Sequence, residues 1–346
     1  MTPPRTRTLA ACPACLAAGD GTQLFESGDR QHGTPGVFRY CICPRCASVF
    51  QNPQVIEEDR ANTYPSCYYT HTDPSLPREP GALRGPRNHM RNWIFAYHYG
   101  TGRLLTRLAG GLLYRVPFLR RRAFFGLIDE LIPPRSRGEK ALDVGCGSGK
   151  ILRALRLAGW DAEGVEWDEN AANVAVSHAD CAVHIGGLFG SALVSASYKL
   201  VLLSHVFEHL DDPVRALARV RELLAPEGRA VLIYPNSAGL GARHFKEHWF
   251  PWEVPRHLVF VHPSEMYATA RSAGLEVTAL RTLHRSAAGV SALSRAYQSG
   301  RVLKAQDISV TVGDHAFMIR ERLRMLYRPT AGEEVLVVLR ANRAKA

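Results

Sequence analysis

The sequence has no hydrophobic run long enough to span a bilayer. Its most apolar stretch, residues 104–119, is interrupted by Arg107, Arg115 and Pro117, so it is too short and too charged for that purpose. The first 11 residues also lack the apolar segment that a secretory signal peptide needs. We therefore expect a cytoplasmic protein without a transmembrane segment, in which cysteines stay reduced or bind metal.

Acidic residues are nearly absent between residues 78 and 122. This segment has ten arginines and one acid, Glu79, and so supplies +9 of the net charge of +11. Residues 136–285 contain 16 basic and 17 acidic residues and are close to neutral. A basic segment of this kind suits an anionic partner, such as a sugar nucleotide, a lipid phosphate, a membrane surface or RNA. A solvated arginine-rich helix is the alternative interpretation.

Cysteine is scarce beyond residue 46, because five of the eight cysteines lie within the first 46 residues. Four of them form two Cys-x-x-Cys turns with 27 residues between, a spacing typical of a zinc ribbon. Such a short segment has little core of its own without metal. Cys41 is a spare thiol that could replace a ligand. The predicted metal ligands are Cys12, Cys15, Cys43 and Cys46.

The strongest local signal is a glycine-rich turn after residue 144. An apolar run at residues 141–144 predicts a strand, and the spacing of apolar residues from Ile151 predicts a helix that ends at Gly159. Glycines between the two permit positive φ and let a ligand lie against the backbone. Lys150 stands where a dinucleotide fingerprint needs its last glycine, and no hydroxyl follows it as in a P-loop.

An acid follows at the expected distance from this turn. Glu166 ends a second apolar strand, residues 162–165, one helix and one strand further along. In a strand–helix–strand unit a carboxylate at this place can accept hydrogen bonds from both hydroxyls of a ribose. The alternative is that Glu166 and Asp168 are ordinary loop acids.

The rest of the chain alternates strands and helices, as in a doubly wound sheet. Asp212 caps a helix that has Pro213 in its first turn and that should end at Gly228. Helical spacing also fills residues 87–131. The further predicted elements are strands at 181–185, 200–204, 229–234, 275–281 and 334–339, and helices at 170–178 and 263–273.

The run Asp143-Val-Gly-Cys-Gly-Ser-Gly149 closely resembles motif I of class I S-adenosylmethionine-dependent methyltransferases. The resemblance implies a Rossmann-like seven-stranded α/β sheet whose last strand is antiparallel, with a small N-terminal zinc ribbon and a helical lead-in. Relatives often have an acid for the adenine after the third strand, where this sequence reads Gly186-Gly187-Leu188. The residues that the resemblance assigns to the cofactor are Asp143, Gly145, Cys146, Gly147, Gly149, Glu166, Trp167, Ser204 and His205.

The segment after the predicted strand at 200–204 reads Ser204-His-Val-Phe-Glu-His-Leu-Asp-Asp-Pro213. It resembles a run found in a large methyltransferase subgroup that includes the quinone O-methyltransferases. His205 or His209 could take a proton from a substrate hydroxyl as the methyl group arrives. Glu208 and His209 could instead orient the loop or hold a divalent ion.

A second loop, residues 244–258, combines two tryptophans with several histidines. It resembles a run in zinc-ribbon methyltransferases, of the methyltransferase-23 kind, that are encoded with bacterial polysaccharide and natural-product genes. We expect a substrate-facing lid in which His257 is the first choice for the catalytic base and Arg256 contacts an anion. A buried His–Arg pair that holds the loop is the alternative. The other predicted substrate contacts are Trp249 and Asn236.

These inferences predict three segments and one activity. The segments are a zinc ribbon at 1–60, a linker with a basic helical cap at 61–135, and a methyltransferase domain at 136–346 with an insertion near 286–331. The expected activity is O-methylation of a sugar, glycolipid or secondary metabolite by S-adenosylmethionine, with Zn²⁺ in the ribbon. An RNA methyltransferase and a non-catalytic zinc-ribbon binding protein are the alternatives.

Overall fold

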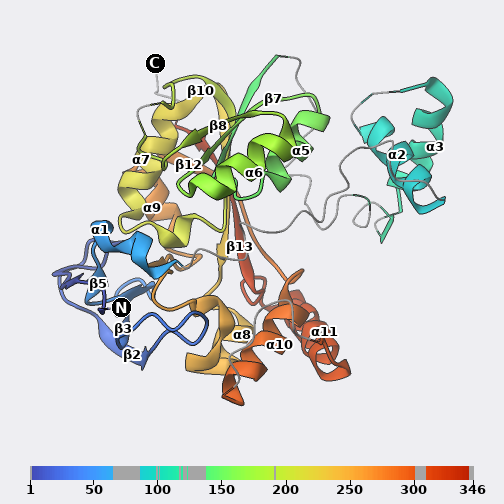
Figure 1. Cartoon of the computed structure of the whole chain (residues 1–346). Helices are drawn as coiled ribbons and strands as arrows, with labels where there is room; N and C mark the ends of the chain where they lie inside the picture. The colour runs from blue at the N-terminus through green and yellow to red at the C-terminus, as the bar shows by residue number, and fades with distance from the viewer. Residues whose placement is uncertain are drawn as a thin grey trace. The chain divides into compact units, whose positions relative to one another are not determined.

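The computed structural model describes residues 2–64, 86–98, 100, 102–116, 118–119, 123, 138–190, 192–300 and 309–342 (Figure 1). The chain divides into two compact units, residues 69–202 and residues 1–68 together with 203–346. None of the described helices is long and apolar enough to cross a membrane.

The predicted α/β sheet is confirmed. Seven strands lie in the order β12-β13-β10-β9-β6-β7-β8. Strand β7 is parallel to both of its neighbours, whereas β13 is antiparallel to both β10 and β12, as the family resemblance implies. The strands are β6 (Lys140–Val144), β7 (Asp161–Glu166), β8 (Ala182–Ile185), β9 (Tyr198–Ser204), β10 (Leu224–Pro235), β12 (Leu275–Leu283) and β13 (Glu334–Ala341).

Two helices follow the first strands of this sheet and pack against each other: α5 (Lys150–Leu157) and α6 (Glu169–Ala179). Figure 1 shows α5 and α6 side by side next to β7 and β8. Helix α6 begins where the Asp168 carboxylate accepts from the Ala171 N–H, which satisfies one of the free amides of its first turn.

The arginine-rich segment contains two helices, α2 (Pro86–His98) and α3 (Leu104–Tyr114), which pack on each other. They approach so closely at Gly110 that a Cβ there would lie 1.8 Å from the Trp93 carbonyl oxygen. A side chain at this position would therefore force the helices apart. The remainder of the predicted helical region, at 120–122 and 124–131, lies outside the described residues.

Helix α7 (Pro213–Leu223) begins as predicted, with the Asp212 side chain accepting from the Arg215 N–H. The predicted end at Gly228 is wrong, because the chain enters β10 directly at Leu224. Leu223 and Leu224 are both buried, so the change from helix to strand happens within the core. The next helices are α8 (Leu240–Phe245) and α9 (Met266–Ser272).

The N-terminal segment forms a small sheet in the order β11-β4-β3-β2, and its edge strand β11 comes from residues 259–260. A second, two-stranded sheet pairs β1 with β5. The bounds are β1 (Thr6–Arg7), β2 (Thr22–Ser27), β3 (Phe38–Ile42), β4 (Val49–Gln51), β5 (Gln54–Val55) and β11 (Val259–Phe260), followed by the short α1 (Glu57–Arg60) and the 3-10 turn η1 (Ala61–Thr63).

The loop at 244–258 is packed into this unit's core and is not an exposed lid, although several of its residues line a pocket, so that its contact with substrate stays a prediction. It contains the 3-10 turns η4 (Lys246–His248) and η5 (Phe250–Trp252). Trp249 and Trp252 are buried with Tyr40 of β3 and Phe260 of β11 in one aromatic cluster.

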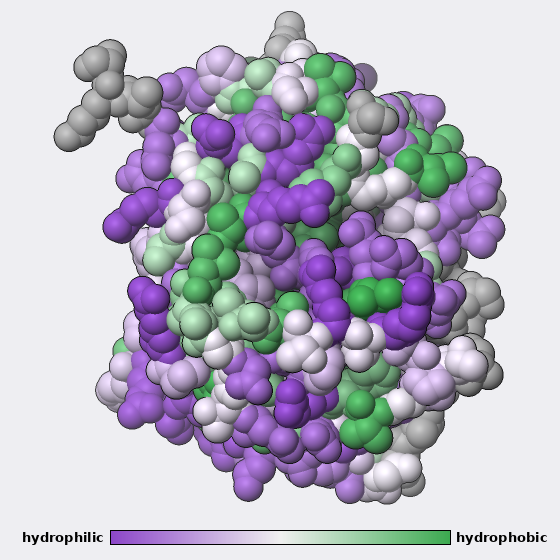
Figure 2. All heavy atoms as spheres, turned by 90° about the vertical axis from the view of Figure 1, so that its left-hand side faces the viewer, coloured by the Kyte–Doolittle hydropathy of each residue, from purple (hydrophilic) through white to green (hydrophobic). Residues whose placement is uncertain are grey.

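On the face seen in Figure 2, hydrophilic side chains predominate and the hydrophobic ones form small separate groups.

The predicted insertion contains two helices that pack together, α10 (Ala287–Gln298) and α11 (Val312–Tyr327). Thr311 and Asp314 form a reciprocal capping box at the start of α11. Asp314 also accepts from Ser291 and Arg295 of α10, so the same carboxylate joins the two helices.

A buried ion pair joins the ribbon to the loop that precedes β11. The Arg256 guanidinium donates to both carboxylate oxygens of Asp29, at 2.8 and 3.0 Å, and both side chains are fully buried. Arg256 also contacts Glu253 at 3.3 Å. Although burial opposes ionisation, Arg256 lowers the pKa of Asp29 to about 2.

We expect Asp29→Asn to lower the free energy of unfolding by about 3 kcal/mol at pH 7, because it leaves the buried Arg256 charge undercompensated. The folded-state pKa of Asp29 is depressed, so its contribution is present above pH 4 and is lost as pH falls towards 2. The difference in the free energy of unfolding between the wild type and Asp29→Asn, measured by urea denaturation, should therefore become smaller between pH 4 and pH 2. Asp59→Asn, in an exposed pair with Arg5, is the control and should change little.

Candidate functional site

The glycine turn after β6 has the geometry that the sequence predicts. Gly145, Gly147 and Gly149 have φ values of 64°, 51° and 81°, in the left-handed region that favours glycine. The Gly147 N–H donates to Glu166 Oε2 at 2.9 Å, and the Asp168 N–H donates to Oε1 at 3.1 Å. Glu166 is therefore more than a loop acid, because its carboxylate fixes the turn against the end of β7.

A buried acid stands in front of this turn. Asp143 is 2% exposed at the end of β6, and its Oδ2 has no hydrogen-bond partner among the described residues. Burial, and then the nearby Glu166 charge, raise the pKa of Asp143 to about 8. An unpartnered buried oxygen beside a bare backbone turn is the arrangement expected where a ligand supplies the missing donor. Trp167, which follows Glu166, is 43% exposed.

The four predicted cysteines come together in the ribbon. Cys12 and Cys46 have their sulfurs 3.7 Å apart, as do Cys15 and Cys43, and the four sulfurs all lie within 4.8 Å of one another. Thiolates at about 2.3 Å from a tetrahedral ion would be about 3.8 Å apart. Cys41 is buried in β3 and does not belong to this group, so it is not a replacement ligand in this arrangement.

Three side chains from the two predicted catalytic segments form a second group. Glu208 and His209 lie in the 3-10 turn η3 (Phe207–His209) after β9, and His257 lies in the loop before β11. One ligand atom of each lies within 4.8 Å of the others. The backbone holds the two segments together, since the Leu258 N–H donates to the Glu208 carbonyl at 2.7 Å.

Both imidazoles of this group are oriented through the same ring atom. Nδ1 of His257 is 2.7 Å from the Pro251 carbonyl oxygen, and Nδ1 of His209 is 2.7 Å from the Tyr64 hydroxyl. The carbonyl can only accept, so His257 carries a proton on Nδ1, and its Nε2 faces Glu208 at 3.9 Å. The two rings meet edge to face with centroids 4.4 Å apart.

Burial and the neighbouring charges together determine whether His209 and Glu208 are ionised. Burial and then the neighbouring His257 lower the pKa of His209 to about 4, so His209 is neutral at pH 7. For Glu208, burial opposes ionisation, but His205 and the other histidines lower its pKa below the usual value. A neutral imidazole beside an ionised carboxylate is able to take up a proton.

His205 has a different character from its neighbours. Its φ of 59° is unusual for a residue other than glycine, and its Nε2 is 3.2 Å from Glu334 Oε1. Burial lowers the pKa of His205, but Glu208 and Glu334 together raise it to about 10. His205 is therefore protonated at neutral pH, which does not suit the base role predicted for it.

The structure corrects three predicted substrate contacts. Arg256 is saturated by Asp29, Glu253 and two backbone carbonyls, so it braces the loop and is not free for an anion. Trp249 is 1% exposed and donates from Nε1 to Glu333. The Asn236 amide donates to the carbonyls of Thr330 and Gly332 and is also buried.

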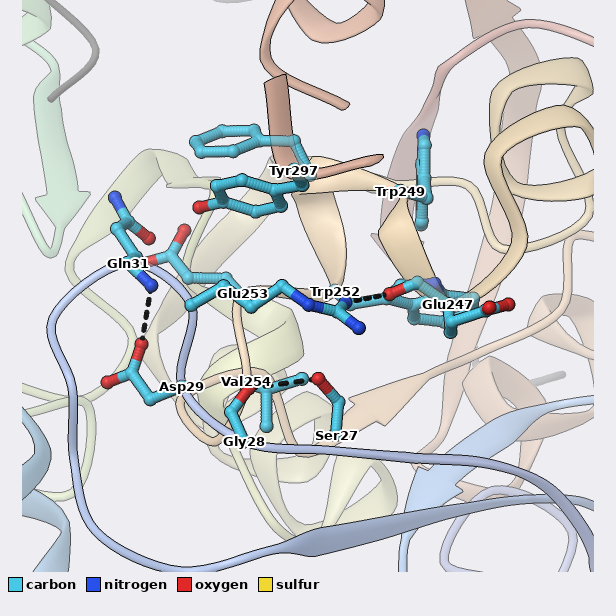
Figure 3. A pocket seen from close by; sticks show the side chains of 12 residues that line it. Ser27, Gly28, Asp29, Gln31, Glu247, Trp249, Trp252, Glu253, Val254 and Tyr297 are labelled. Carbon is cyan, nitrogen blue, oxygen red and sulfur yellow. Dashed lines mark hydrogen bonds between the residues drawn. The ribbon is translucent and has the colours of Figure 1, made fainter. Parts of the chain in front are cut away.

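Sequence reasoning missed a pocket beside the aromatic loop (Figure 3). Tyr297 of α10 lies on one side of it, and Ser27 to Asp29 lie on the other. Its wall also contains Trp252 and the acidic side chain of Glu247. The only sequence signal was the unusual density of aromatic residues at 249–252, which gave no indication of a partner in α10.

Known proteins resemble this chain over the sheet. Residues 118–280 match the model of a family described as a methyltransferase domain. Ubiquinone biosynthesis O-methyltransferases are similar: that of Ralstonia nicotianae is 30% identical over 42% of this chain and 66% of its own length, and that of Aromatoleum aromaticum is 27% identical over 41% and 66%. The chain thus spans just under two thirds of these relatives.

Among solved structures, a chain of the complex between the Haloferax volcanii Trm112 methyltransferase activator and a methyltransferase is 19% identical. The match covers 68% of this chain and 96% of that one, with a TM-score of 0.47.

The strand order, with β13 antiparallel between β10 and β12, and the glycine turn backed by Glu166 define the class I methyltransferase fold. Residues 118–280 match a methyltransferase domain, and the fold around them is that of the class I S-adenosylmethionine-dependent methyltransferases.

The raised pKa of Asp143 predicts a pH dependence of stability. The folded protein keeps a proton on Asp143 up to about pH 8, whereas the unfolded chain loses it near pH 4. The free energy of unfolding should therefore fall between those values by roughly 1.4 kcal/mol per pH unit from this group. Asp143→Asn should remove that slope in ligand-free protein. Identical pH profiles for the two proteins, measured by denaturation, would contradict the burial argument.

Proposed function

We propose that this protein transfers the methyl group of S-adenosylmethionine to a hydroxyl group of a small molecule. The observation that carries the proposal is the turn from Asp143 to Gly149 with Glu166 bonded to its backbone. The names of the similar ubiquinone O-methyltransferases support oxygen as the acceptor atom. A sugar, a glycolipid or a secondary metabolite remains the acceptor class that we propose, and a phenolic ring belongs to the same chemistry.

The residues present fit the cofactor. The bare turn at Gly145, Cys146, Gly147 and Gly149 leaves room for its methionine end, and the unpartnered Oδ2 of Asp143 can accept from a ligand donor. We propose that Glu166 receives the ribose hydroxyls, with contributions from Trp167, Ser204 and His205. When bound, the cofactor supplies an electrophilic methyl group for in-line displacement.

The acceptor hydroxyl must lose a proton during transfer, and we propose that the group of Glu208, His209 and His257 handles it. His209 is neutral and partly exposed, while His257 is almost completely buried behind it. The ionised Glu208 stabilises the positive charge that a protonated imidazole would carry.

We propose Zn²⁺ as the ion of the four-cysteine group, with a structural role. Four protein thiolates fill a tetrahedral coordination shell and leave no open position for chemistry. A cytoplasmic location, where thiols are kept reduced, suits this group.

Loss of the Glu166 carboxylate should weaken cofactor binding. We expect Glu166→Gln to raise the dissociation constant of S-adenosylmethionine by about 10- to 100-fold, because a charged acceptor is worth about 1.5–3 kcal/mol in such hydrogen bonds. Glu169→Gln, an exposed position in the next helical turn, is the matched control for isothermal titration calorimetry. Equal affinities for the two variants would remove Glu166 from the site.

The activity itself is tested with methyl-labelled S-adenosylmethionine and fractionated extract of a strain lacking the gene. Label should enter carbohydrate or small metabolites, and His209→Ala should reduce the rate by about 10²- to 10⁴-fold, the usual contribution of a positioned base. Label in RNA would overturn the acceptor class but keep the reaction. Absence of label from every fraction would favour the non-catalytic alternative.

A further inference from the structure

We propose that Glu208, His209 and His257 form a second metal site, which binds a divalent transition-metal ion such as Zn²⁺, Fe²⁺ or Co²⁺. This site is separate from the four-cysteine group of the ribbon. The binding of the ion follows from the geometry of these side chains alone, whereas its role in catalysis rests on the function proposed above.

The orientation of the two histidines is the first observation. In both rings Nδ1 is engaged, by the Pro251 carbonyl for His257 and by the Tyr64 hydroxyl for His209. Metal-binding histidines almost always have their second nitrogen held in this way, because it fixes the tautomer and the direction of the ring. One nitrogen of each ring and one oxygen of the Glu208 carboxylate lie within 4.8 Å of one another, and for His257 the nitrogen that faces Glu208 is Nε2.

The condition of Glu208 is the second observation. Its side chain is 0% exposed, and neither carboxylate oxygen has a hydrogen-bond partner among the described residues. His205 compensates part of the Glu208 charge as an ion pair at 3.6 Å, but the two carboxylate oxygens still lack a direct donor, which is costly for a buried carboxylate unless something binds it. The nearest ring nitrogens, His205 Nδ1 at 3.6 Å and His257 Nε2 at 3.9 Å, are beyond hydrogen-bonding distance.

The spacing matches a shared ion better than a direct contact. Two ligand atoms that each lie about 2.1 Å from a metal are separated by about 3.4 Å at a tetrahedral angle, and by at most about 4.2 Å. The Glu208–His257 distance of 3.9 Å falls within that range. Glu253 Oε2 also lies 3.6 Å from His257 Nε2, outside the group of three ligands.

The donor set selects the kind of ion. Two imidazoles and one carboxylate are the ligands of catalytic zinc sites and of non-haem iron sites. Magnesium and calcium prefer oxygen ligands alone, so they should bind this group weakly. The partial exposure of His209 gives the ion a path from solvent.

Three protein ligands leave at least one coordination position open. An acceptor hydroxyl bound there would have a lowered pKa and would release its proton to water or buffer. Its oxygen would then form a bond to the methyl carbon as the carbon–sulfur bond of S-adenosylmethionine breaks, which yields a methyl ether and S-adenosylhomocysteine. In this deeper form of the proposed function, Glu208, His209 and His257 promote loss of the acceptor proton through the ion that they hold.

Metal binding is tested on the full chain with its ribbon loaded with zinc. We titrate Co²⁺ and measure the bound ions per chain by elemental analysis after desalting. The wild type should bind one ion beyond the ribbon zinc, and its spectrum should lack the thiolate charge-transfer band that cobalt in the ribbon would produce. Glu208→Gln and His209→Asn should lose this ion, with affinity lowered at least 100-fold. Glu321→Gln, which alters another completely buried carboxyl without hydrogen-bond partners, should retain it.

Several outcomes would overturn the proposal: no second ion in the wild type, equal binding in all variants, or a thiolate band in the spectrum of the second ion. Circular dichroism checks that each variant folds, and His209→Asn, at a partly exposed position, keeps the test valid if Glu208→Gln does not fold. If the ion binds but its removal by a mild chelator leaves methyl transfer unchanged, the metal site stands and its catalytic role fails. If methyl transfer is absent even with the ion bound, the proposed function fails alone.

Discussion

The contacts of the buried Arg256 guanidinium hold together the unit that residues 1–68 and 203–346 form. The guanidinium contacts Asp29 of the ribbon and Glu253 of its own loop, and it donates to the Thr63 carbonyl. Since Tyr64 follows Thr63 and His257 follows Arg256, this one cation positions both Tyr64, the partner of His209, and His257 itself. A charge buried at this depth tolerates few alternative geometries, because each lost partner costs several kcal/mol. The rigidity of the histidine group is thus inherited from an ion pair that takes no part in its chemistry.

Two acids show how the same side chain is used in opposite ways. Asp29 is buried against a cation, so its pKa falls to about 2 and its charge supports the fold. Asp143 is buried near another acid, so its pKa rises to about 8 and its ionisation opposes the fold until a ligand compensates it. Asp29 thus stabilises the fold, whereas Asp143 is typical of a binding site, where a group kept for its ligand lowers the stability of the ligand-free protein.

Local signals in the sequence predicted the parts of the fold that local chemistry determines. The glycine turn, the paired cysteines and the Asp212–Pro213 start of α7 each depend on residues close together in the chain. The errors arose where distant segments meet. The tryptophans of the 244–258 loop resembled an exposed lid until the ribbon supplied Tyr40 to cover them. Arg256 resembled an anion contact because Asp29 lies 227 residues away. The tetrad of cysteines could be predicted from spacing, whereas the meeting of His209 with His257 required the whole fold.

The small sheet of the ribbon can be completed only late in synthesis, because its edge strand β11 lies far along the chain. Residues 259 and 260 of this strand pair with β4, whose own residues end at position 51. A ribosome adding about 5–20 residues per second needs roughly 10–40 s to travel between the two. During that interval the nascent N-terminal segment has its four cysteines but not the strand that completes its sheet. The Zn²⁺ that we propose for the four cysteines could therefore bind before the sheet is complete and hold the segment together until β11 has been synthesised.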